Sequence, residues 1–226
     1  MKEFLLTVLK ARLDAEAWKW LQGAVAAAAS GASANDALSS YTAASRRLGK
    51  QALKLDSLER AKLAGHNALF NIDHWGADEA GRAAILLAVA EHHQEAYIQL
   101  AQDCYELGDS REQQSWLRGL SVLPKSELFL NTAIDSCRTN IIPVFEAIAC
   151  ENLYPSVHFP ELNFNQLVLK CLFNGIAMTR IIGLESRLNT ELSRMADSYR
   201  SERQAAGRSV PADIWLVIEP AKGVTQ

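Results

Sequence analysis

The sequence predicts an all-α protein, and two observations support this fold class. Residues that break helices are sparse, with 12 glycines and 6 prolines among 226 residues. Apolar residues recur at spacings of three and four, the period of an amphipathic helix, and no β-branched or aromatic run alternates with period two. Short turns between helices favour an α-solenoid-like or irregular array of stacked antiparallel hairpins, with about nine to eleven helices.

The first part of the chain is expected to hold a long helix, a short one and a third. Residues 2–29 form the long helix, because its apolar side chains share one stripe. These side chains are Leu5, Leu9, Leu13, Ala17 and Leu21. Segment 30–33 ends this helix, and Asn35 or Asp36 can then start a short second helix. Asp56 opens a third helix, which extends to Leu69.

The middle of the chain is divided by residues that start and stop helices. The predicted elements are a helix from Asp78 to Leu107 that bends near His92 and His93, a turn at 108–110, a helix over 112–121 stopped by Pro124, and a helix over 126–137. Asp78 is expected to cap its helix, since a short carboxylate can accept a hydrogen bond from an unpaired N–H of the first turn.

The sequence of the last third of the chain predicts further amphipathic or apolar helices. Asn140 is the expected N-cap of the first, and Pro143 fits in its first turn, where a missing N–H breaks no helical bond. The expected elements are helices over 141–150, 160–173, 190–206 and 212–216, with a turn at 152–155. Since no linker divides the chain, we expect one domain over 1–220 and a frayed tail over 221–226.

Charge and hydropathy exclude several classes of function. The chain carries 26 acidic and 23 basic residues, a net charge of −3, which does not favour a nucleic-acid partner. The apolar run from Phe4 to Leu9 is too short for a signal peptide, and no stretch approaches the roughly 20 apolar residues of a membrane helix. We therefore expect a cytoplasmic protein without an integral membrane segment.

The sequence lacks the motifs of common metal and cofactor sites. His92 and His93 are adjacent, so on a helix they point about 100° apart, and no HExxH motif is present. No dinucleotide-binding, Walker or nucleophile-elbow motif occurs. The four cysteines form no CxxC pair and are expected to be small buried thiols. We expect neither a metal nor a cofactor.

A basic segment stands out near a turn. Residues 45–50 read Ser-Arg-Arg-Leu-Gly-Lys, and Lys54 lies just beyond them. Arginine and lysine beside a glycine can hold a phosphate or a carboxylate. The alternative is a solvated basic loop, and the sequence leaves both interpretations open.

Two very apolar helices each carry an isolated charge. Glu146 lies in the apolar run 141–149, and Lys170 lies in the apolar run 167–173. Helices that are apolar nearly all round are usually buried, and a buried lone charge is costly unless it is paired. Either these two side chains meet each other or Arg138, or they line a polar cavity that could bind a ligand.

The chain resembles the EboA family, most densely from Arg138 to Arg208. The residues that carry the resemblance there are Arg138-Thr139-Asn140, 144–149, Tyr154-Pro155, Phe159, 165–170, 183–189 and 202–208. Earlier segments that also resemble the family are 48–50, Trp75, Arg82 with 85–87, and 120–124. The resemblance covers most of the chain. No single motif is specific to the family, and the specificity comes from the occurrence of all these segments in this order.

The resemblance implies a bacterial gene cluster that makes or delivers a small secondary metabolite. Its neighbours resemble a UbiA-type prenyltransferase, a TatD-like metal hydrolase, a dehydroquinate-synthase-like enzyme and a sugar-phosphate-isomerase-like protein. In cyanobacteria the cluster is linked to moving a scytonemin precursor to the periplasm. The expected partners are therefore a small-molecule pathway intermediate and other ebo-type pathway proteins.

Two functions follow as hypotheses. The first is a helical protein that binds a pathway intermediate or acts as a scaffold for the pathway enzymes. The second is an enzyme that uses Glu146 and Lys170 as acid and base, with Arg138 or Arg187 holding an anionic group. The candidate ligand-binding residues are Arg138, Asn140, Glu146, Asn165, Gln166, Lys170 and Arg187.

Overall fold

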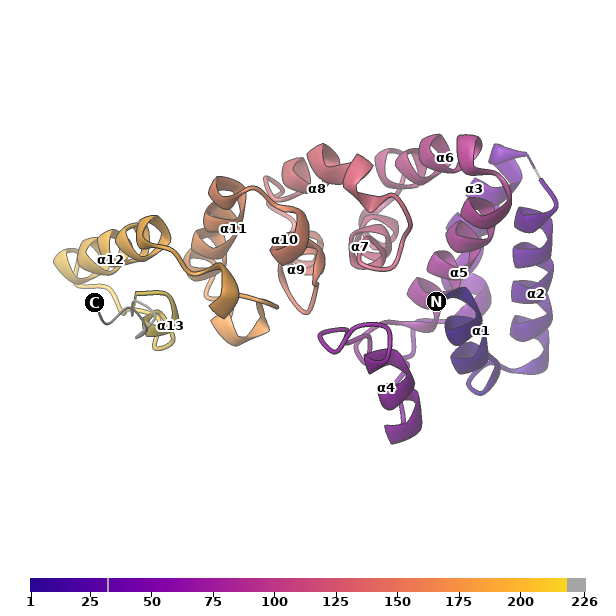
Figure 1. The fold of residues 1–226 in the computed structure, drawn as a ribbon, viewed down its shortest axis with the longest axis horizontal. Helices are drawn as coiled ribbons and strands as arrows, with labels where there is room; N and C mark the ends of the chain where they lie inside the picture. The colour runs from indigo at the N-terminus through magenta and orange to yellow at the C-terminus, as the bar shows by residue number, and fades with distance from the viewer. Residues whose placement is uncertain (32, 219–226) are drawn as a thin grey trace. The chain divides into compact units, whose positions relative to one another are not determined.

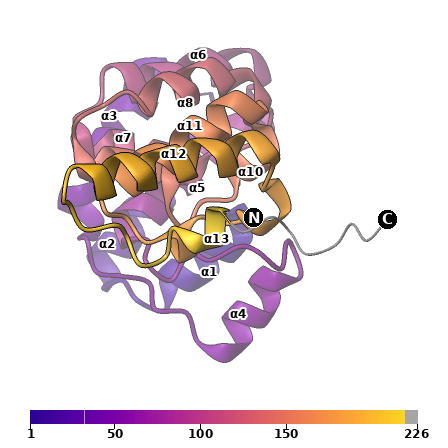
Figure 2. The ribbon, with the colours of Figure 1, turned by 90° about the vertical axis from the view of Figure 1, so that its left-hand side faces the viewer.

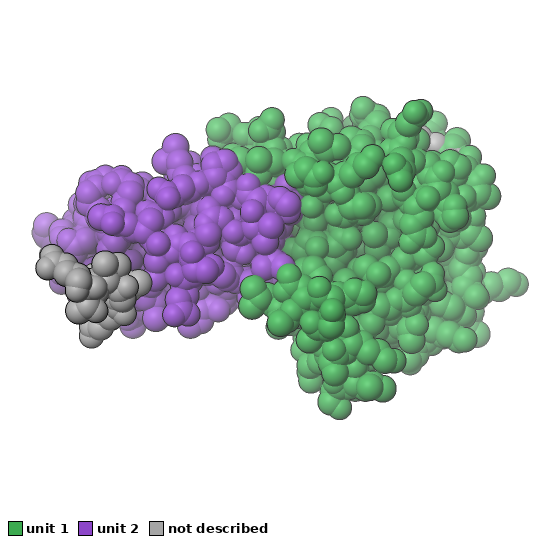
Figure 3. All heavy atoms as spheres, viewed as in Figure 1, with its two compact units in different colours: residues 1–148 green, residues 149–226 purple. Residues whose placement is uncertain are grey.

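The computed structural model describes residues 1–31 and 33–218 and confirms the all-α fold class. The described residues form thirteen α-helices, more than the nine to eleven expected. Among these residues the β-type pairing is an isolated antiparallel bridge between Ala52 and Gly76. The chain divides into two compact units, 1–148 and 149–226 (Figure 3). The single domain and the stacked-hairpin arrangement stay predictions, and the predicted frayed tail lies outside the described residues.

The first unit contains the larger set of helices (Figure 1). They are α1 (Lys2–Lys10), α2 (Ala15–Ala29), α3 (Ala34–Leu48), α4 (Ser57–Ala64), α5 (Ala77–His92), α6 (Gln94–Glu106), α7 (Ser110–Gly119), the 3₁₀ helix η1 (Ser126–Phe129), α8 (Leu130–Ser136) and α9 (Ile142–Ala149), the last of which reaches the boundary with the second unit.

Helix α5 is the centre of the first unit. It packs against α1, α2, α3, α6 and α7 (Figure 1 and Figure 2). All residues from Ala77 to Ala90 are buried, as expected for a helix that is apolar on nearly every side. At its start, the Glu79 carboxylate accepts a hydrogen bond from the Gly76 N–H at 2.7 Å. The core of this unit therefore forms around a single enclosed helix.

The predicted long first helix is wrong, because α1 and α2 are separated by the break 11–14. The Asp14 carboxylate accepts a hydrogen bond from the Ala17 N–H at 2.8 Å, which starts a new helix there. Arg12 lies in the break and pairs with Glu59 at 2.6 Å. A cap and an ion pair with a distant residue interrupt a stripe that looks continuous in sequence.

Other boundaries agree better with the sequence. The bend near His92 and His93 is confirmed, since α5 ends and α6 begins there. The turn at 108–110 is also confirmed, and Asp109 caps α7 by accepting the N–H of Glu112 at 2.9 Å. The predicted short second helix is wrong, because α3 is 15 residues long and is capped by Ser33.

The second unit is built from the remaining elements. They are α10 (Tyr154–His158), α11 (Glu161–Phe173), the 3₁₀ helices η2 (Met178–Arg180) and η3 (Glu185–Arg187), α12 (Thr190–Ala205) and α13 (Trp215–Ile218). Helix α10 forms where a turn was predicted, with Pro155 in its first turn. An ion pair at 2.7 Å joins Arg180 to Glu151.

The described helices carry no membrane-crossing candidate, since none of them combines the length and the hydrophobicity that a span needs.

Candidate functional site

Arg187, a candidate ligand-binding residue, contacts backbone carbonyls in the second unit. Its guanidinium donates to the carbonyl oxygens of Ser156 at 2.5 Å and Phe159 at 2.7 Å. The same group lies over the ring of Phe164, 4.6 Å from its centroid. These contacts attach η3 to the end of α10, so the guanidinium already has a structural role in this position.

Asn165 is also engaged by a protein group. It is buried on α11 and exchanges two side-chain hydrogen bonds with Asn189, at 3.0 and 3.2 Å. Asn189 in turn accepts the N–H of Leu192 at 2.8 Å and caps α12. The two amides thereby fix the start of one helix against the middle of another.

The remaining sequence-predicted residues are spread over both units. Arg138 is exposed and pairs with Asp135 at 2.8 Å. Asn140 is exposed, and the prediction that it is the N-cap is wrong by one residue, because α9 begins at Ile142 and the Ile141 carbonyl accepts the N–H of Phe145. Glu146 is half-buried on α9, Lys170 is half-buried on α11, and Gln166 is exposed on α11. Glu146 and Lys170 fall in different units, so their pairing, and the ligand site built on them, stay predictions.

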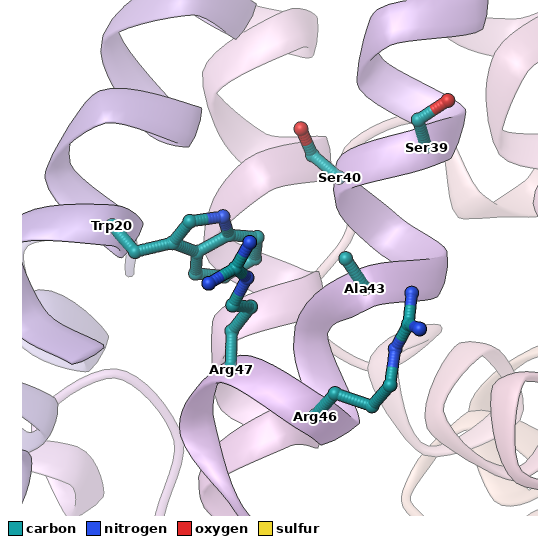
Figure 4. A pocket seen from close by; sticks show the side chains of 6 residues that line it. All are labelled: Trp20, Ser39, Ser40, Ala43, Arg46 and Arg47. Atoms are coloured by element: carbon teal, nitrogen blue, oxygen red, sulfur yellow. The ribbon is translucent and has the colours of Figure 1, made fainter. Parts of the chain in front are cut away.

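A hollow of about 440 Å³ lies on the surface of the first unit, between α2 and α3 (Figure 4). Its lining residues are Trp20 from α2 and Ser39, Ser40, Ala43, Arg46 and Arg47 from α3. Its volume is within the range of about 300–1,000 Å³ that is typical of small-molecule sites. Arg46 and Arg47 of the basic segment 45–50 line the hollow, and they lie in the last turn of α3 rather than in a loop.

Helical spacing explains how α3 builds one wall of the hollow. Ser39, Ala43 and Arg46 are separated by four and three residues, so they lie on one face of the helix. Ser40 and Arg47 are one position further along and widen the same face. Figure 4 shows the two serines at one end, Ala43 in the middle and the arginines at the other end.

The two arginines give the hollow a local positive charge. Both side chains are exposed, and neither forms a salt bridge or a side-chain hydrogen bond with another described residue. They belong to the last turn of α3, where the helix dipole favours cations. Since no carboxylate is among the lining residues, this charge remains available to a bound anion.

A buried network behind α3 holds this helix in place. Asp78 is fully buried on α5 and accepts hydrogen bonds from the Ser45 hydroxyl at 2.6 Å and from Arg82 and Arg111 at 3.1 and 2.8 Å. Arg82 also donates to the carbonyl oxygen of Tyr41 at 2.9 Å. Because Ser45 and Tyr41 belong to α3, the network joins the helix that lines the hollow to the core helix.

The charges of this network nearly balance one another. Glu79 is buried beside Asp78 and pairs with Arg118 and, at 3.3 Å, with Arg111. Burial acts to raise the pKa of Asp78, but hydrogen bonds from Arg111 and Ser45 and the charges of Arg111 and Arg82 outweigh it and lower that pKa. The acidic pair is therefore neutralised inside the unit and does not cancel the charge of the hollow.

Sequence reasoning identified part of this arrangement. The basic segment was singled out, but Trp20 was not, because an indole on a helix usually belongs to the core. The predicted capping role of Asp78 is wrong, because Gly76 is the N-cap of α5 and the Asp78 carboxylate accepts hydrogen bonds within the network. The sequence signal that could have revealed it is Asp78-Glu79 followed by Arg82 in a helix that is otherwise apolar.

The lining of the hollow is suited to binding rather than to acid–base chemistry. Tryptophan, serine, alanine and arginine offer a flat apolar face, two hydroxyls and two permanent cations, but no carboxylate, imidazole or thiol that could exchange a proton near neutral pH. Within the described part of the chain, no group of three or more His, Cys, Asp or Glu side chains is placed to hold a metal ion.

Comparison with known proteins identifies a related family. The family model described as metabolite traffic protein EboA matches residues 1–219, which is nearly the whole chain. Neither the comparison with curated proteins nor the comparison with solved structures finds a match.

Proposed function

Because the chain belongs to the EboA family, whose description is metabolite traffic protein, we propose that it binds a small metabolite and passes it on chemically unchanged. The binding site is the hollow between α2 and α3. The recipients are other proteins of the same ebo-type pathway. In this account the protein is a carrier, and the chemistry belongs to its partners.

The single observation that carries this proposal is the composition of the hollow. A volume of about 440 Å³ suits a small organic molecule, and Arg46 and Arg47 offer two unneutralised cations to it. Two hydrogen bonds hold the wall in place: the Ser45 hydroxyl donates to the buried Asp78, and the buried Arg82 donates to the Tyr41 carbonyl oxygen. The wall therefore lies on a fixed helix rather than on a loop. A preformed wall lowers the entropy cost of binding.

The enzyme hypothesis is the second candidate. Glu146 and Lys170 are both half-buried on helices rich in apolar residues, and a carboxylate and an amine are side-chain types that can serve as general acid or base. We favour the carrier because Arg187, one of the two arginines expected to hold the anionic group in such an enzyme, makes its hydrogen bonds to protein carbonyls, and Asn165, another candidate ligand-binding residue, makes its hydrogen bonds to Asn189. An enzyme would convert the pathway intermediate, whereas a carrier would release it unaltered.

The test is mass spectrometry of the small molecules that purified protein releases on denaturation. We expect a stoichiometric metabolite from the wild-type protein and its loss from the double variant Arg46→Ala/Arg47→Ala. The matched control is Arg194→Ala/Arg208→Ala, which removes the same charge from exposed positions in the second unit and should keep the metabolite. Equal release from all three proteins would place the binding site elsewhere. Release lost only in Glu146→Gln or Lys170→Met would favour the second candidate.

A further inference from the structure

We propose that the molecule bound in the hollow is an organic acid with a flat apolar body. Its carboxylate or phosphate group lies at Arg46 and Arg47, and its body packs against Trp20. This inference rests on the proposed function, since it names the class of molecule that the hollow carries.

The acid group follows from the two guanidinium groups. Arg46 and Arg47 are adjacent, exposed and without a carboxylate partner among the described side chains. A guanidinium presents a planar fork of N–H donors that matches carboxylate and phosphate oxygens in pairs. Asp78, which contacts α3 through Ser45, does not neutralise them, because it already accepts hydrogen bonds from Arg82 and Arg111. The chain is acidic overall, so this positive charge is a local feature.

The flat body follows from the opposite wall. Figure 4 shows Trp20 reaching from α2 across the hollow towards α3, with Arg47 extending in the direction of the indole. On α3 the middle of the wall is Ala43, whose side chain is a single methyl group and leaves room above it. An indole together with a small apolar residue in the lining favours a planar ring, which can stack on the tryptophan.

The length of the hollow excludes a bare inorganic anion as its full occupant. Ser39 and Arg46 are seven residues apart on α3, a distance of roughly 10 Å along a helix that rises 1.5 Å per residue. The Ser39 and Ser40 hydroxyls make no side-chain hydrogen bond to another described residue. They are available to a polar group at the far end of the ligand, with the acid group at the arginine end.

The experiment measures binding of four probes to the full chain by isothermal titration calorimetry. The probes are 2-naphthoate, 2-naphthyl phosphate, the neutral isostere 2-naphthamide, and inorganic phosphate. We expect both naphthyl anions to bind at least tenfold more tightly than the amide, and inorganic phosphate to bind more weakly than either. The tighter of the two anions identifies whether a carboxylate or a phosphate is preferred.

The variants separate this inference from the proposed function. Arg46→Ala/Arg47→Ala should lower the affinity for both naphthyl anions to the affinity for the amide. Arg194→Ala/Arg208→Ala should leave the affinity for the anions unchanged. Trp20→Ala should weaken the naphthyl probes by at least fivefold and leave inorganic phosphate unaffected. All of these positions are half-buried or exposed, and circular dichroism checks that each variant folds.

The contrary outcomes are distinct. Amide binding as tight as anion binding would overturn the ligand class and leave the hollow as a binding site for neutral molecules. Anion binding that the arginine variant does not weaken would overturn it as well. If no naphthyl probe binds but purified protein retains a metabolite that depends on Arg46 and Arg47, only the claim that the ligand has a flat apolar body would be overturned. Failure of the probes without any retained metabolite would overturn the proposed function too.

Discussion

Replacing Asp78 by asparagine should destabilise the first unit strongly. Asp78 is fully buried and accepts four hydrogen bonds, one from Ser45, one from Arg82 and two from Arg111. Asparagine has nearly the same shape but carries no charge. The substitution therefore leaves the buried guanidinium of Arg82 without a salt-bridge partner.

The expected cost follows from the burial of the two partners. The Arg82 side chain is 2 % exposed, so it cannot recover hydration when Asp78 is neutralised, whereas Arg111 is 27 % exposed and can. Breaking a buried pair by removing one partner costs about 3–5 kcal/mol. This is a large fraction of the roughly 5–15 kcal/mol that stabilises a typical domain. We expect about 3 kcal/mol, because water reaches part of the network through Arg111.

Urea unfolding followed by circular dichroism measures this change in the free energy of unfolding. The control is Asp135→Asn, whose carboxylate pairs with the exposed Arg138 at the surface of the same unit and should cost under about 1 kcal/mol. The double variant Asp78→Asn/Arg82→Met should recover part of the loss, since no unpaired buried charge remains. A cost for Asp78→Asn no larger than for the control, or strict additivity in the double variant, would refute the reasoning.

The same carboxylate gives a pH dependence with a definite sign. The pKa of Asp78 is lowered from its ordinary value of 3.8, so as the pH falls the unfolded chain takes up this proton before the folded chain does. Its contribution is present above about pH 4 and is lost as the pH falls through the folded-state pKa. Asp78→Asn should therefore show a shallower loss of stability below pH 4 than the wild-type protein. An identical slope would contradict the lowered pKa.

Three further predictions concern other parts of the chain. Arg187→Ala should destabilise the second unit by about 1–3 kcal/mol, because backbone carbonyls lose a charged donor, and a midpoint of urea unfolding unchanged from the wild type would contradict this. Asp14→Ala removes the cap on the Ala17 N–H and should cost about 1 kcal/mol by the same assay, with Asp14→Asn as the control that retains it. Burial raises the pKa of the Cys104 thiol, so in native protein at pH 8 a thiol reagent should modify the half-buried Cys137 first, and faster labelling of Cys104 would refute its placement.

The sequence was sufficient for elements whose signals are local. Gly108-Asp109-Ser110 marks a turn with a capping aspartate, and that turn is present. The bend near His92 and His93 was also correct. The break between α1 and α2 is not visible in the periodicity: Asp14 caps α2 there, and Arg12 in the break pairs with Glu59, 47 residues away. Periodicity reports which face of a helix is apolar, and it does not report a tertiary contact that interrupts the helix.

The hollow could be predicted only in part for a similar reason. Arg46 and Arg47 are visible as a basic cluster, but their role depends on Trp20, which belongs to another helix. Asp78 looks like a cap in sequence, and only the packing of α5 shows that Arg82 and Arg111 surround it. The sequence identifies which side chains are charged, polar or aromatic. Only the structure shows which of them meet across neighbouring helices.

The most direct test that the hollow is the binding site for a flat organic acid is an NMR titration that follows the indole N–H signals while 2-naphthoate is added. The chain has five tryptophans, and Trp20→Phe assigns the signal of the one that lines the hollow. The account predicts that the Trp20 signal shifts with added naphthoate, and that Arg46→Ala/Arg47→Ala suppresses this shift. Naphthoate that shifts the other indole signals and leaves Trp20 unchanged would contradict it.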